Sequence, residues 1–91
     1  MRPFAMSVHD TFHLENGTTV FVGSIEPDAK LIPACECEIV LGSSVKLSIR
    51  IDGEMMIAKK RSPDRAISSS QHVDLASHGI GRSGFGIRSK R

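Results

Sequence analysis

Residues 34–60, ACECEIVLGSSVKLSIRIDGEMMIAKK, decide the fold that this sequence predicts. Apolar and polar side chains alternate on both sides of a break at residues 42–44, and a period of two is typical of a β-strand. After the break one face carries Val45, Leu47, Ile49 and Ile51, and the other carries Lys46, Ser48 and Arg50. We expect the first set to be buried and the second to be exposed.

A second turn follows at Asp52-Gly53, a dipeptide that tolerates the positive φ angles of a type I′ hairpin. Residues 54–59 then alternate weakly and can return as a third strand. The stretch therefore predicts a three-stranded antiparallel meander.

The preceding residues predict another hairpin. Residues 9–15 and the β-branched run 18–25 flank Asn16-Gly17, again a strong turn dipeptide. Gly23 interrupts the second run, which indicates a bulge or a close approach of another backbone. Residues 1–8 form either a frayed end or a short edge strand.

Residues 66–70 and 85–88 have the pattern of further short strands, and no window has a sustained helical period. About six or seven short strands at close spacing indicate an all-β barrel or sandwich. We predict one small antiparallel β-barrel over residues 1–91, with residues 1–8 and 89–91 expected to fray. A chain of this length supports one domain with a small core.

The composition is that of a globular domain, with 40% hydrophobic and 24% charged residues. No apolar run approaches the roughly 20 residues that span a bilayer, and no signal peptide is recognisable, so a cytoplasmic location without membrane contact is expected. Cys35 and Cys37 leave one face of one strand, where a disulfide would be too tight. Two reduced, buried thiols are therefore expected.

The charges are divided unevenly along the chain. Residues 1–58 carry four Lys/Arg against eight Asp/Glu, a net charge of −4, whereas residues 59–91 carry eight against two, a net charge of +6. Basic residues beside glycines and one aromatic are typical of single-stranded nucleic-acid binders. The candidate nucleic-acid-binding residues are Lys59, Lys60, Arg61, Arg65, Arg82 and Arg88. The alternative is a solvated basic rim that binds no nucleic acid.

No catalytic or metal constellation is recognisable. The histidines are isolated, and the serine run 68–70 lacks a Gly-x-Ser-x-Gly context. Cys35 and Cys37 are separated by a single residue, which is not the spacing of a structural zinc site. No catalytic residue and no cofactor are expected. The sequence favours a non-enzymatic binding or accessory module that contacts RNA or a ribonucleoprotein, and the alternative is a protein–protein interaction or structural domain.

Three segments in order, residues 19–26 (TVFVGSIE), 37–40 (CEIV) and 51–56 (IDGEMM), resemble the second domain of translational GTPases such as elongation factor Tu. The resemblance covers roughly residues 10–89. It implies a β-barrel that packs beside a nucleotide-binding domain and can contact tRNA or ribosomal RNA. The chain has no phosphate-binding loop of the Gly-x-x-x-x-Gly-Lys-Ser/Thr type, so it does not hydrolyse GTP in that way.

Arg61 and Arg65, followed by the segment 74–79 (DLASHG), resemble in part the cyclic-dinucleotide motif of PilZ domains. Two arginines at that spacing can clamp phosphates. However, Ala76 stands where that motif has Ser, and the two halves of the motif are too close together. The pattern therefore does not predict a cyclic-dinucleotide site.

Overall fold

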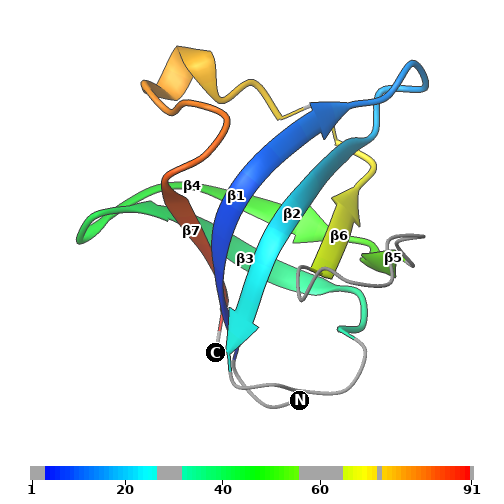
Figure 1. Cartoon of the computed structure of the whole chain (residues 1–91), viewed down its shortest axis with the longest axis horizontal. Helices are drawn as coiled ribbons and strands as arrows, with labels where there is room; N and C mark the ends of the chain where they lie inside the picture. The colour runs from blue at the N-terminus through cyan, green and yellow to red at the C-terminus, as the bar shows by residue number, and fades with distance from the viewer. Residues whose placement is uncertain (1–3, 27–31, 56–64, 72, 91) are drawn as a thin grey trace.

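The structure is a computed structural model that describes residues 4–26, 32–55, 65–71 and 73–90. Seven antiparallel strands form one strongly curled sheet with the order β4-β3-β7-β1-β2-β6-β5 (Figure 1). The strands are β1 (Ala5–His13), β2 (Thr19–Glu26), β3 (Cys35–Leu41), β4 (Ser44–Ile51), β5 (Gly53–Met55), β6 (Arg65–Ser69) and β7 (Phe85–Ser89). Among the described residues the only helix is the 3-10 turn η1 (Ala76–His78). The predicted all-β class is confirmed.

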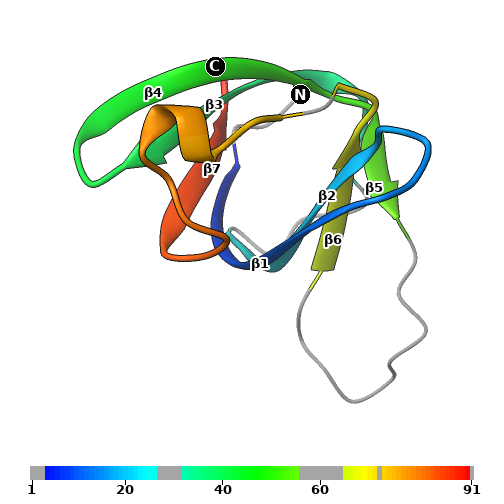
Figure 2. The same cartoon turned by 90° about the horizontal axis from the view of Figure 1, so that it is seen from above.

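The two edges of the sheet meet because β4 and β5 are consecutive in the chain, separated only by Asp52. The Asp52 amide donates to the Ser68 carbonyl at 2.7 Å, so the bent strand reaches β6. The sheet thus curls so that its last strands, β6 and β5, approach β4 at the other edge, as Figure 2 shows from above. The predicted hairpin at Asp52-Gly53 is wrong, since residues 53–55 pair with β6 and do not return along β4.

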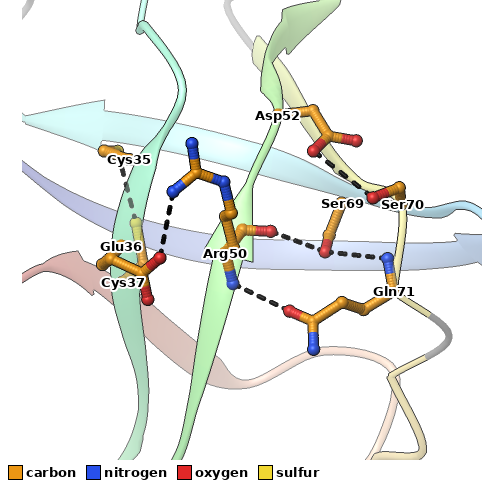
Figure 3. A network of polar contacts seen from close by, with 8 residues as sticks. All are labelled: Cys35, Glu36, Cys37, Arg50, Asp52, Ser69, Ser70 and Gln71. Atoms are coloured by element: carbon orange, nitrogen blue, oxygen red, sulfur yellow. Dashed lines mark hydrogen bonds and ion pairs between the residues drawn. The ribbon is translucent and has the colours of Figure 1, made fainter.

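Polar side chains join β4 to β6 at this seam (Figure 3). The Ser69 hydroxyl donates to the Arg50 carbonyl at 2.7 Å, and the Arg50 amide donates to Oε1 of Gln71 at 2.9 Å. Ser69 is fully buried. Its hydroxyl also accepts from the Gln71 amide at 3.2 Å, which satisfies a polar group inside the core.

The β1–β2 hairpin is confirmed: the Leu14 amide donates to the Thr18 carbonyl at 2.8 Å, and Gly17 has a φ of 90°. Residues 5–8 are not frayed, because they pair with both β2 and β7, whereas residues 1–3 of the predicted frayed end lie outside the described residues. Nor does the far end fray at Ser89, whose amide and hydroxyl bond the backbone of Phe4 at 3.1 and 3.0 Å. Strand β1 is therefore central in the sheet.

Gly23 has the role that the sequence indicated. The register of β1 against β2 shifts between Val8 and Asp10, directly opposite Gly23. A Cβ on Gly23 would lie 1.9 Å from the carbonyl oxygen of Ser7, which is far shorter than the van der Waals contact distance of a carbon and an oxygen atom. The bulge lets the sheet bend sharply, and only glycine fits where the two backbones come together.

The core lies inside the curl, with Phe21, Ile39, Ile67 and Ile87 essentially inaccessible. Ile49 and Ile51 are buried as predicted, and the alternate residues of β4 are exposed. The prediction is wrong for Val45, which is 47% exposed, and Leu47 is only partly buried. A bulge between Ile39 and Val40 adds one residue to β4, which moves Val45 to the outer face of the sheet.

The segment after β6 closes one end of the curl. The Thr19 hydroxyl donates to the Gln71 carbonyl and accepts from the Val73 amide, both at 3.0 Å. Val73, Leu75 and Ile80 are buried against the core, although residues 73–76 form no strand. Val73 and Leu75 alternate with exposed residues because two side chains of this loop are buried in the core, and not because the loop pairs with a strand.

Candidate binding groove

Two of the basic residues that the sequence singled out, Arg65 and Arg88, lie on opposite faces of the sheet. Lys59, Lys60 and Arg61 lie outside the described residues. Arg65 is in register with Gly23, which is in register with the core residue Val8, so its side chain lies on the inner face. Arg88 is in register with Ala5 on the outer face.

Each of the four arginines in the described part of the chain pairs with a carboxylate. Arg65 bonds Glu54, and Arg88 bonds Glu38 at 3.0 Å. Arg82 reaches Asp10 at 3.0 Å, and its guanidinium lies over the ring of Phe12, 5.8 Å from the centroid. The fourth pair is Arg50–Glu36 at 3.1 Å. The described residues carry eight Asp/Glu against six Lys/Arg, so this part of the surface is not basic.

Strand β7 lies between β3 and β1 in the sheet (Figure 1). A groove lined by residues of these three strands runs along the outer face of β7. It consists of two adjoining hollows of about 580 and 280 Å³. Ser7, Val40 and Gly86 line both of them, so the hollows are continuous. These three residues come from three different strands and are in register with one another.

Small side chains make the floor of this groove. Ser24, Ser7 and Gly86 form one row across β2, β1 and β7, and Ala5 follows in the next row. The alternate residues of the same strands, such as Met6 and Ile87, point into the core. In the row of Ser24, Ser7 and Gly86 the outward side chains are therefore small, which leaves this part of the sheet surface open to close approach by another chain.

Gly86 is the lowest point of the floor. A Cβ at this position would lie 3.3 Å from the Met6 carbonyl oxygen, so even alanine would press on β1. The residue thus serves close packing of the strands, and it lines both hollows together with Val40. Val40 lines both hollows and gives this side of the groove an apolar wall.

Polar groups mark the two ends. Arg88 and Glu26 line one end, where Arg88 is already engaged by Glu38. His9 and the backbone around Gly84 line the other end. Positive and negative groups are mixed along the groove, and its interior is apolar or neutral.

Sequence reasoning did not locate the groove. The one aromatic that lies beside the basic residues and glycines is Phe85, which is buried and cannot stack on a base. A usable signal was present: the apolar residues Met6, Val8, Phe85 and Ile87 alternate with small ones. This alternation predicts a bare outer face once the two strands are known to be paired.

Comparisons with protein-family models, with curated proteins and with solved structures found no match. In the part of the chain that the structure describes, no helix is long and apolar enough to cross a membrane.

Proposed function

We propose that this domain is a non-enzymatic binding module that docks an extended polypeptide segment in the groove along β7. The observation that carries the proposal is the continuous hollow over Ser7, Gly86 and Val40, with small side chains beneath and an apolar wall at one side. Concave, mostly apolar surfaces with a few polar groups at the margins are typical of binding sites. The partner is another protein, as in the interaction alternative stated from the sequence.

The length and charge of the groove favour a polypeptide over a polyanion. The five residues of β7 extend over about 16 Å at roughly 3.3 Å per residue, which matches about five residues of extended chain. The carboxylates of Glu26 and Glu38 lie at one end and would repel phosphates. A partner side chain that is large and apolar fits over Gly86 against Val40.

A displayed library of random peptides tests this proposal. The domain should enrich peptides with a large apolar residue at a fixed position. Ser7→Leu fills the groove from an exposed position and should weaken binding at least roughly tenfold, since it excludes the partner from the floor. Ser48→Leu is the matched control, because Ser48 is exposed on the outer face but lines neither hollow.

The binding proposal fails if no peptide is enriched, or if Ser7→Leu binds as tightly as the unaltered domain. Equal losses in Ser7→Leu and Ser48→Leu would also count against it, because the groove would then have no special role. Circular dichroism of both variants verifies that the strands remain folded.

A second candidate function is weak RNA contact, and the +6 charge of residues 59–91 favours it. Three adjacent positive charges come from Lys59, Lys60 and Arg61, which lie outside the described residues. The resemblance to the second domain of translational GTPases suggests an RNA partner. Labelled single-stranded RNA should then bind with an affinity that falls steeply with salt, because phosphate neutralisation releases counterions. Changing all three residues to Glu should abolish binding.

The two candidates separate cleanly. RNA binding that is lost with the triple change but retained in Ser7→Leu supports the RNA function alone. Peptide binding with the opposite response supports the groove. Absence of RNA binding at low salt removes the second candidate.

A further inference from the structure

Two thiols face each other on the inner side of β3. Cys35 and Cys37 are free, and their Sγ atoms are 3.7 Å apart (Figure 3). They leave the same face of one strand, two residues apart, so the rigid backbone of the β3–β4 ladder holds this separation. No side-chain rearrangement is needed to bring the sulfurs together.

The separation fits a chelated metal ion. In tetrahedral coordination with metal–sulfur bonds of about 2.3 Å, two thiolates on one ion lie about 3.8 Å apart. The observed 3.7 Å agrees with this value, whereas a disulfide requires about 2.05 Å. The resting geometry thus suits a shared ion better than a covalent bond between the sulfurs.

The surroundings determine which ions suit the pair. Cys37 is fully buried, in register with Ile49 and Ser89, and Cys35 is half-buried, so the pair opens to solvent through Cys35. Burial, together with the neighbouring Cys35, raises the pKa of the Cys37 thiol, so a metal must displace its proton. Thiolate ligands in an apolar setting select soft ions such as Cd²⁺, Cu⁺ and Zn²⁺.

We propose that Cys35 and Cys37 together bind one thiophilic metal ion through both sulfurs. Two metal–sulfur bonds form, two S–H bonds break, and two protons are released to solvent, with no change in oxidation state. The described residues contain no group of three or more metal-ligating side chains, so water or a solute completes the coordination. This open two-sulfur site differs from the four-ligand structural zinc site that the sequence does not offer.

Titration of the reduced protein with Cd²⁺ tests the proposal. A sulfur-to-metal charge-transfer band should grow and saturate at one ion per chain. Cys35→Ser and Cys37→Ser should each lower the affinity roughly a hundredfold, because the second sulfur acts at high effective concentration. His78→Gln, which removes an exposed imidazole, is the control and should leave the titration unchanged.

A second measurement needs no variant and therefore survives if Cys37→Ser does not fold. Phenylarsine oxide condenses with two neighbouring thiols to give two As–S bonds and one water. The intact mass should show one adduct per chain, with both thiols lost to later alkylation. The proposal is overturned if Cd²⁺ gives no charge-transfer band, if either serine variant keeps full affinity, or if the arsenical leaves one thiol free.

Discussion

The carboxylate of Glu54 accepts two hydrogen bonds from the guanidinium of Arg65, from Nε at 2.7 Å and from Nη2 at 2.5 Å. Only 8% of the Glu54 side chain and 17% of the Arg65 side chain are exposed. The same carboxylate accepts the Ile32 amide at 3.0 Å. The pair thus joins β5 and β6 to the segment that precedes β3.

Glu54→Gln should lower the free energy of unfolding by about 3 kcal/mol, because it removes the negative charge that accepts two hydrogen bonds from a largely buried guanidinium. Arg50→Gln is the control: its pair with Glu36 is more than half exposed on both sides, so the loss should stay below about 1 kcal/mol. Urea unfolding measures both. Equal losses would show that burial of the Arg65 pair has no energetic effect.

The same pair makes stability depend on acid. The hydrogen bonds from Arg65 lower the pKa of Glu54 from its ordinary value of 4.5. A carboxylate with a lowered pKa in the folded state stabilises the fold above that ordinary value, and the stabilisation is lost as the pH falls through the lowered pKa. The difference in Tm between the unaltered domain and Glu54→Gln should therefore shrink below pH 4.5. A constant difference down to strong acid would contradict the assignment.

Truncation of the side chain should change the stability of the domain strongly at one position of β4 and hardly at all at another. Ile49 is buried, so Ile49→Ala should destabilise the domain by about 2–5 kcal/mol through lost burial and a cavity. Val45→Ala should change stability by less than about 0.5 kcal/mol, because the bulge has moved that side chain to the surface. Chemical denaturation distinguishes them, and a large effect at Val45 would refute the register shift.

Gly23→Ala should be among the most disruptive single substitutions. Its methyl group would meet the Ser7 carbonyl at 1.9 Å, and a backbone atom in a ladder cannot move aside without breaking strand pairing. We expect a loss of at least about 3 kcal/mol. Gly81→Ala is the control, because the nearest atom to its Cβ is 3.9 Å away and its backbone angle is ordinary. Thermal unfolding of the two variants gives the comparison.

The two thiols should differ in reactivity when no metal is present. Cys37 is buried and its pKa is raised above the ordinary 9.0, so it stays protonated at neutral pH. Alkylation requires the thiolate, and Cys35 is the more accessible of the two. Iodoacetamide at pH 8 should modify Cys35 first, and peptide mapping by mass spectrometry locates the label. Initial labelling at Cys37 would be inconsistent with this burial.

Local patterns predicted most of the strands and the hairpin pairs β1–β2 and β3–β4, but not the pairing of strands that are distant in the sequence. The alternation around Ile49 and the Asn16-Gly17 turn are determined by neighbouring residues, and both are confirmed. Asp52-Gly53 has the same local chemistry as a hairpin turn, yet β5 pairs with β6. The choice depends on Ser68, whose carbonyl accepts the Asp52 amide from a distant part of the sequence.

The candidate site was harder to predict because small side chains, and not reactive or charged ones, form its floor. Gly86 and Ser7 have no chemical signature by themselves, and they form a groove only because the register brings them together. The basic residues were conspicuous in sequence, but the carboxylates that engage Arg82 and Arg88 come from strands far away in the chain. Charge counting along a sequence cannot reveal such pairing.

The bonds between Phe4 and Ser89 bring the first and last described strands together at the same end of the sheet. Domains whose two ends lie side by side tolerate insertion into a surface loop of another protein, because the host needs to open only a small gap. A short linker from Lys90 back to Phe4 would likewise permit a permuted chain that opens between Asn16 and Gly17. The contact between Phe4 and Ser89 would thus allow the domain to be grafted into a host loop without a long linker.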